Sequence, residues 1–120
     1  MRFWTIFLLL VFLCRCTPVS RELTQEKETL SVTFIYADSQ AKKVCLAGSF
    51  NQWSARTLCM EKEKAVWRVN VPLPPGRYPY LFLVDDQTWR LDPGAPLTED
   101  NGFGSKNSVL IVEGSVTKPD

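Results

Sequence analysis

The sequence predicts an all-β sandwich of about seven short antiparallel strands. Apolar residues alternate with polar ones in several short segments, which is the period of a half-buried strand. Turn-forming residues separate these segments at intervals of about 8–12 residues. The chain has no convincing amphipathic helix, and its 120 residues, 45% of them hydrophobic, suit one domain with a short appendage.

The first half of the domain begins with the clearest alternation. Leu30, Val32, Phe34 and Tyr36 are separated by single residues that are mostly polar, which predicts a half-buried strand. The segments that follow are expected to form, in order, a turn (37–41), a second strand (43–47), a loop (48–54), a short edge strand (58–60) and a charged turn (61–64).

The second half of the domain contains the strongest strand signal, which lies over residues 77–84. Trp67 alternates in phase with Val69 and Val71, so we expect its side chain in the core. Prolines at 72, 74 and 75 are expected to break the sheet, because proline lacks a donor for the ladder. The remaining segments are expected to be the main strand (77–84), an acidic turn (85–87), a strand (88–91), a long irregular stretch (92–107), the last strand (108–112) and a tail (114–120).

The N-terminus has the composition of an export signal. A basic start at Arg2 precedes an apolar run over residues 3–13, which is too short to span a bilayer but suits a signal peptide over residues 1–16. Cys14 and Cys16 are candidate lipidation sites of a bacterial lipoprotein, and secretion through an uncleaved or atypical signal is the alternative. Residues 17–29 are polar and read as a linker. We therefore expect an extracytoplasmic protein, either anchored to the envelope membrane by its lipid or secreted.

Composition argues against several classes of function. The net charge is +1 and the basic residues are scattered, so the chain lacks the basic stripe of a nucleic-acid-binding protein. Histidine, the commonest general base and metal ligand, is absent from the sequence. The acidic residues at 85, 86, 92, 99 and 100 read as ordinary turn residues rather than a catalytic pair. We expect neither an enzyme nor a bound metal or cofactor.

Two cysteines lie within the expected domain. In an oxidising compartment Cys45 and Cys59 would form a disulfide across the loop that contains Trp53. The alternative is that both are small buried hydrophobic residues. A bridge would stiffen the loop.

Several segments, in this order, resemble one family. They are 44–53 (VCLAGSFNQW), Trp67, 73–85 (LPPGRYPYLFLVD), 89–93 (WRLDP) and 104–107 (GSKN). Together they resemble the glycogen-binding domain of the AMP-activated protein kinase β-subunit and the N-terminal modules of starch-branching and isoamylase-type debranching enzymes. The resemblance covers nearly all of residues 30–113. It implies an immunoglobulin-like early-set sandwich that recognises α-glucan without catalysis.

The resemblance also implies a set of binding residues. Trp53 and Trp89 correspond to the two tryptophans that stack on glucose, and Asn107 to the asparagine that bonds sugar hydroxyls. Ser105 replaces an assisting threonine, and Phe103 replaces a leucine that protrudes into the ring of the glucan. This agrees with the chemistry of a sugar, whose apolar faces suit flat aromatic rings with polar groups beside them.

Structural roles are the alternatives at these positions. Trp53 would instead cover the end of the sandwich, Trp89 would cover a sheet face, and Asn107 would brace the turn into the last strand. One departure from the family bears on binding. Leu81 stands where binding members have a lysine that reaches sugar hydroxyls, and Arg90 or Lys106 are candidates to replace that donor.

Two functions therefore remain from the sequence. The first is an exported, non-catalytic binding module for an α-glucan such as glycogen or maltodextrin. The second is a protein-interaction or envelope-structural domain that keeps the fold without binding sugar, with an unidentified envelope protein as its partner. The loss of the family lysine at Leu81 favours the second function, whereas the aromatic set favours the first.

Overall fold

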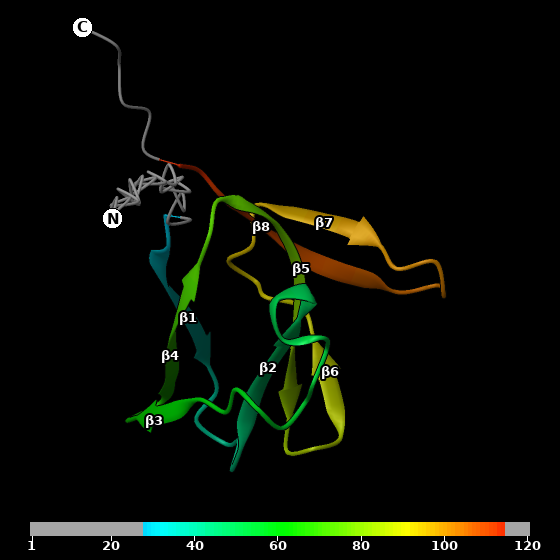
Figure 1. Cartoon of the computed structure of the whole chain (residues 1–120). Helices are drawn as coiled ribbons and strands as arrows, with labels where there is room; N and C mark the ends of the chain where they lie inside the picture. Colours follow the sequence, from blue (N-terminus) through cyan, green and yellow to red (C-terminus); the bar gives the residue numbers. More distant parts are fainter. Residues whose placement is uncertain (1–27, 115–120) are drawn as a thin grey trace, which may run out of the picture.

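The computed structural model describes residues 28–114 and confirms the β-sandwich. Eight strands form two antiparallel sheets (Figure 1). The smaller sheet has the order β1-β4-β3, and the larger has the order β2-β5-β8-β7 with β6 also paired to β5. The elements are β1 (Leu30–Ala37), β2 (Val44–Gly48), the 3-10 turn η1 (Ser49–Asn51), β3 (Glu61–Glu63), β4 (Val66–Leu73), β5 (Gly76–Val84), β6 (Thr88–Arg90), β7 (Leu97–Asp100) and β8 (Lys106–Val112).

The core lies between the two sheets and is dominated by aromatic rings. Phe34 on β1 makes an edge contact with Tyr80 on β5, at 5.0 Å between ring centroids. Tyr36 on β1 packs on Phe82 in a tilted arrangement, at 4.9 Å between ring centroids. Phe34, Tyr80 and Phe82 are almost fully buried, as the alternation along both strands predicts. Ring pairs between β1 and β5 therefore join the two sheets.

The structure buries Trp67 as the sequence predicts. The side chain is 6% exposed, and its Nε1–H donates a 3.0 Å hydrogen bond to the carbonyl oxygen of Asp38. This bond satisfies the one polar atom of the indole, so the ring can remain in the interior. Trp67 takes no part in a surface site.

The predicted charged turn at 61–64 is wrong. Residues 61–63 form the edge strand β3 against β4, and only the residues that follow turn the chain, with Lys64 at a φ of 59°. The Arg68 side chain on β4 lies 3.6 Å from the Glu63 carboxylate, so cross-strand charges are matched. Exposed charges of this kind are typical of an edge strand protected from further pairing.

Two further expectations are corrected. The stretch 92–107, predicted to be irregular, contains β7, which pairs with β8 from Leu97 opposite Val109 to Asp100 opposite Lys106.

The smaller sheet also continues through Pro72, which pairs with Ser31 and was expected to break the sheet. At that position β4 has a neighbour on one side only, since β3 pairs with β4 no further than residue 68. A strand tolerates proline where one side is open.

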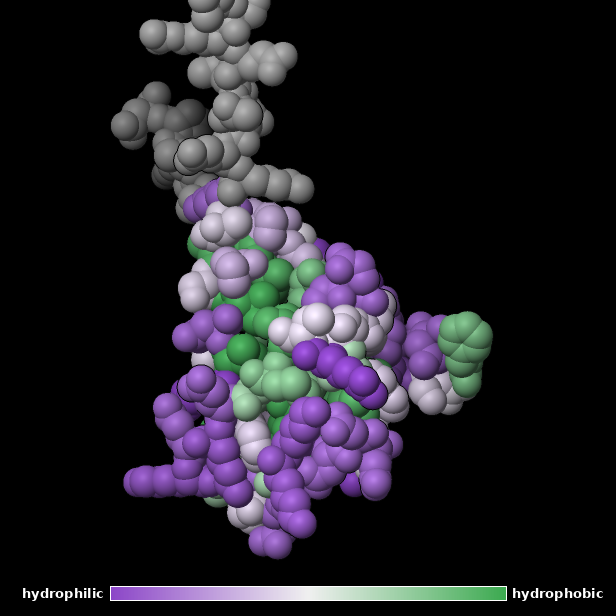
Figure 2. Space-filling model, turned by 60° about the horizontal axis from the view of Figure 1, so that its bottom comes forward, coloured by the Kyte–Doolittle hydropathy of each residue, from purple (hydrophilic) through white to green (hydrophobic). Residues whose placement is uncertain are grey.

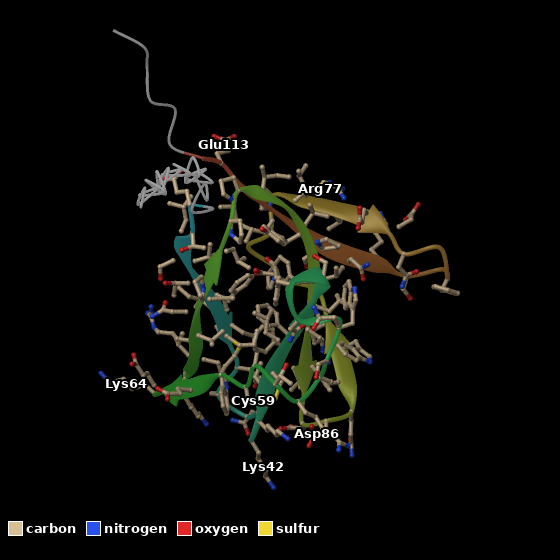
Figure 3. The ribbon with its side chains drawn as sticks, in the orientation of Figure 1. Lys42, Cys59, Lys64, Arg77, Asp86 and Glu113 are labelled. Atoms are coloured by element: carbon tan, nitrogen blue, oxygen red, sulfur yellow. A yellow bond between two sulfur atoms is a disulfide. The ribbon has the colours of Figure 1, made fainter. Side chains whose placement is uncertain are left out.

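Cys45 and Cys59 are joined by a disulfide in the structure. The segment predicted as an edge strand at 58–60 runs beside β2 as an isolated bridge, with Cys59 opposite Cys45. Figure 3 labels Cys59. Cys45 is 1% exposed, whereas Cys59 is exposed. The segment therefore covers the outer edge of β2.

The proposed export signal with Cys14 and Cys16, most of the 17–29 linker and nearly all of the 114–120 tail lie outside the described residues. Within residues 28–114, no helix has the length and apolar character needed to cross a membrane.

A buried tyrosine connects the core to the β6–β7 connection. The Tyr80 hydroxyl donates a 2.5 Å hydrogen bond to Asp92 Oδ2. The other carboxylate oxygen of Asp92 accepts the Gly94 N–H at 2.8 Å, and the Asp92 N–H donates to the buried hydroxyl of Ser108. Asp92 is thus a structural residue, and its bonds fix the start of the connection that leads to β7.

Replacing Tyr80 with Phe keeps the ring and removes the hydroxyl. We expect the free energy of unfolding at pH 7 to fall by about 1.5–3 kcal/mol, because a hydrogen bond to a carboxylate is lost. Burial and the bond to Asp92 raise the pKa of Tyr80 far above its usual value of 10.0. The unfolded chain therefore ionises at residue 80 as the pH rises above 10, while the folded protein keeps its proton.

The wild type should accordingly lose stability above pH 10 more steeply than Tyr80→Phe. Urea unfolding from pH 7 to 11 measures both slopes. Burial also raises the pKa of Tyr36, but this residue is present in both proteins, so the difference isolates Tyr80. Identical pH dependence in the two proteins would contradict the buried, hydrogen-bonded hydroxyl.

Candidate functional site

The outer face of the larger sheet is set by the alternation along β5. Tyr80 and Phe82 point into the core, so Leu81 and Leu83 point outward. Leu83 pairs with Trp89 on β6, and Leu81 pairs with Ala47 on β2. Directly opposed residues share a face, and Trp89 therefore lies on the outer face beside Leu83. Its side chain is 48% exposed.

Trp53 reaches this region from the loop after β2. The loop is fixed by the Asn51 side chain, whose Oδ1 accepts the Gly48 N–H at 3.0 Å. Its Nδ2 donates to the carbonyl oxygens of Leu46 and Ser54, both at 3.1 Å, and to the Thr57 hydroxyl at 3.3 Å. A single amide thus holds the loop at both ends. The Trp53 N–H also bonds the Gly48 carbonyl at 2.9 Å.

The backbone at Trp53 has an uncommon conformation. Gln52 and Trp53 have φ values of 54° and 58°, in the left-handed region that bulky residues rarely adopt. Such conformations persist where the surroundings impose them, and they concentrate at functional sites. Phe50 points inward and contacts Phe34 at 5.7 Å between centroids, while Trp53 remains 38% exposed. The turn therefore packs one ring against the core and leaves the other exposed to solvent.

The close approach of the loop to β5 requires glycine at position 48. A Cβ at Gly48 would lie 2.7 Å from the carbonyl oxygen of Pro79 and 2.7 Å from the Phe50 ring. Backbone cannot move aside cheaply, so only glycine fits. This contact sets the loop directly against the strand that supplies Leu81.

The β7–β8 hairpin bounds the same region on a third side, beside the outer face of β5–β6 and the loop after β2. Figure 1 shows this hairpin reaching away from the body of the domain, and in Figure 2 its projecting turn ends in a hydrophobic group. Asn101 Oδ1 accepts the N–H groups of Phe103 and Ser105, at 2.8 and 3.2 Å, and closes the turn. Gly102 and Gly104 provide its positive φ values of 81° and 83°. Phe103 at the tip is 92% exposed.

An ion pair attaches the hairpin to the sheet. Arg77 Nη1 on β5 lies 2.5 Å from Glu99 Oε2 on β7. Since β8 lies between these strands, the pair crosses β8. Glu99 is also the register partner of Asn107, so this contact fixes the strand beside Asn107.

These elements enclose an open hollow of about 480 Å³. It brings together all five residues that the family resemblance implicated, and none of its lining residues is charged. The lining residues are Trp53, Leu81, Trp89, Asn101, Phe103, Ser105 and Asn107. The two indoles are exposed and face one hollow, which argues against purely structural roles for them. Their part in binding remains a prediction.

Two lining residues were not foreseen as part of the binding surface. In the sequence Leu81 stands out only as a departure from the family, and Asn101 does not stand out at all. The signal for Asn101 was an asparagine ahead of two glycines, the composition of a tight turn. Arg90 and Lys106, the candidate replacement donors, line an adjoining hollow that shares Leu81, Trp89 and Ser105 with the first.

The acidic residues of the turn between β5 and β6 serve the fold. Asp85 Oδ1 accepts the N–H groups of Lys42 and Lys43 at 2.7 and 2.9 Å, and Asp86 pairs with the Lys43 ammonium at 3.1 Å. Figure 3 shows Lys42 and Asp86 at the same end of the sandwich. In the part of the chain that the structure describes, no group of three or more potential ligands among Cys, Asp and Glu could hold a metal ion.

Comparison with known proteins supports the same family. The model of the glycogen recognition site of AMP-activated protein kinase matches residues 30–118. Protein FLOURY ENDOSPERM 6, chloroplastic, of Oryza sativa subsp. japonica is 35% identical over 95 residues, which is 77% of this chain and 17% of the rice protein. The 5'-AMP-activated protein kinase subunit beta-1 of Sus scrofa is 38% identical over 72 residues, which is 60% of this chain and 56% of the pig sequence.

A solved structure shares the fold. The maltogenic amylase from S. marinus aligns with a TM-score of 0.61 at 23% identity, over 72% of this chain and 14% of the amylase. The chain spans less than two thirds of the length of each of these relatives. The likeness therefore concerns one domain of larger proteins.

Replacing Asn51 with Ala tests how the loop is held. We expect the free energy of unfolding to fall by about 2–3 kcal/mol, because one acceptor and three donor contacts are lost and backbone groups are left without partners. Trp53 should become more mobile, and its fluorescence more accessible to acrylamide. Ser49→Ala, at an exposed position of the same loop, is the control and should change neither quantity. Unchanged quenching in Asn51→Ala would refute the role of Asn51.

Proposed function

Because the chain belongs to the family of the glycogen recognition site of AMP-activated protein kinase, a carbohydrate-binding module, we propose that it binds an α-glucan of the glycogen or maltodextrin kind. The hollow between Trp53 and Trp89 is the proposed site. The observation on which this rests is the convergence of two exposed indoles with three uncharged polar side chains around one concave surface.

The chemistry of the hollow suits a neutral sugar chain. The apolar C–H faces of glucose stack on flat rings, and Trp53 and Trp89 offer two such rings. Asn101, Ser105 and Asn107 provide amide and hydroxyl groups for hydroxyls at the sugar edge. Leu81 adds an apolar side chain to the lining of the hollow, at the position where binding relatives have a lysine. We expect binding through stacking and neutral hydrogen bonds.

We further propose that the domain performs no catalysis on the glucan. Asp85, Asp92 and Glu99 are each engaged in bonds that hold loops or strands. Glycoside hydrolysis needs two carboxyl groups that face the scissile glycosidic bond, and no Asp or Glu lines the hollow. The role of the module is capture of the polysaccharide.

Export of the chain is a separate proposal. It is supported by the basic and apolar N-terminus and by the Cys45–Cys59 disulfide, because disulfides persist mainly in oxidising compartments.

Removing either indole tests the site. We expect Trp53→Ala and Trp89→Ala each to weaken binding of maltoheptaose by about tenfold or more, since truncating an aromatic anchor of a binding site costs roughly 2 kcal/mol or more. Isothermal titration measures the dissociation constant. Leu97→Ala is the matched control, because Leu97 is as exposed as Trp89, at 48%, but lies outside the hollow.

Circular dichroism must show that each variant is folded before the titration is interpreted. Equal affinity of both tryptophan variants and the wild type would sink the proposal. Failure of the wild type to bind any maltodextrin at millimolar concentration would favour the protein-interaction alternative.

Restoring the family lysine tests the role of Leu81 in the lining of the hollow. We expect Leu81→Lys to strengthen binding of maltoheptaose by about tenfold. A charged donor to a sugar hydroxyl contributes roughly 1.5–3 kcal/mol, and the entropic cost of ordering the lysine side chain offsets part of that gain. Leu81→Met is the control, with a long side chain and no donor. A lysine variant that binds no better than the methionine variant would show that sugar hydroxyls lie out of reach.

A further inference from the structure

The disulfide and Trp89 occupy one row across the outer face of the larger sheet. Cys45 on β2 pairs with Leu83 on β5, and Leu83 pairs with Trp89 on β6. Cys59 lies opposite Cys45 on the other side of β2. Opposed residues share a face, so the cystine lies on the face that carries the hollow. It also closes the loop that carries Trp53, with 14 residues of sequence separation.

The segment around Cys59 is held to β2 by little else in the backbone. The Leu46 N–H donates to the Leu58 carbonyl, and the Met60 N–H donates to the Val44 carbonyl, both at 2.8 Å. The segment belongs to no regular strand and lies at the edge of the sheet. Short pairings of this kind open at low free energy. Met60 is anchored in the core, so without the covalent bond we expect residues 57–59, rather than the whole segment, to detach transiently.

A side-chain contact links this segment to the binding loop. Asn51 Nδ2 bonds the Thr57 hydroxyl at 3.3 Å, two residues before Cys59. The same Asn51 amide fixes the turn in which Trp53 has its left-handed backbone. Detachment of residues 57–59 would therefore release one of the bonds that orient Asn51, and with it the position of the Trp53 indole.

We propose that the Cys45–Cys59 disulfide is a redox control of the glucan site, which is complete in the oxidised protein and loosened by dithiol reduction. This rests on the proposed function. Cys59 is exposed whereas Cys45 is buried, so an attacking thiolate reaches Cys59 and the sulfur of Cys45 is the one that leaves. The thiolate bonds to Cys59 Sγ, and the S–S electron pair leaves with Cys45 Sγ, which takes up a proton.

The second thiol of the dithiol then completes the exchange. It attacks the reductant's own sulfur in the mixed disulfide, closes a cyclic disulfide and releases the Cys59 thiolate, which is protonated. Two electrons and two protons pass from the dithiol to the protein. The product has free thiols at 45 and 59 and a loop held only by non-covalent contacts.

Titration of the full chain with maltoheptaose, before and after dithiothreitol, tests the proposal. We expect about tenfold weaker binding after reduction, because the loop must then be ordered when the sugar binds. The Cys45→Ala/Cys59→Ser double variant should bind as weakly as the reduced protein, with or without dithiothreitol. It retains Cys14 and Cys16, so it also controls for reduction at those positions.

Equal affinity of the oxidised and reduced proteins, both folded by circular dichroism, would overturn the redox control and leave the sugar site standing. Absence of binding by the oxidised wild type would overturn the proposed function itself. Should the reduced protein unfold, the Thr57→Ala variant decides, since its disulfide stays closed and only the link to Asn51 is lost. Wild-type affinity in Thr57→Ala would overturn the proposal, and weaker binding would support it.

Discussion

The two faces of β5 impose the constraint on which the site depends. A strand sends successive side chains to opposite sides, so Tyr80 and Phe82 fill the core only if Leu81 and Leu83 face outward. A shift of pairing by one residue would exchange the two sets and expose the core aromatics. The packing of Phe34 against Tyr80 therefore fixes Leu81 in the lining of the hollow as firmly as it fixes the sandwich.

The alternation of apolar and polar residues predicted which side chains of the strands are buried. The alternation around Tyr80 and Trp67 determines which side chains are buried, and the structure agrees with it at both positions. β7 escaped prediction because Leu97–Asp100 is short and mostly polar, and it is a strand only because β8 lies beside it. Each residue of β7 pairs with a residue of β8 no more than twelve positions further along the chain, but no periodicity within the segment itself reveals the pairing.

The residues of the hollow were found through family resemblance rather than through periodicity. The segments 44–53 and 73–85 carry Trp53 and Leu81, and their order along the chain indicated a shared architecture. The contribution of Asn101 was less visible, because its side chain closes a turn whose neighbours appear only after folding. Asp92 is similar: its partner Tyr80 lies twelve positions away and on another strand.

The absence of charge among the residues that line the hollow affects how the domain associates with a polysaccharide. Long-range attraction is not available, so encounters follow ordinary diffusion and should be almost independent of ionic strength. A glucan polymer compensates through repetition, since each chain offers many equivalent segments, and a molecule that releases one segment remains within reach of the next. Such a domain would remain on a granule or a polymer surface by frequent recapture rather than by a long-lived single contact.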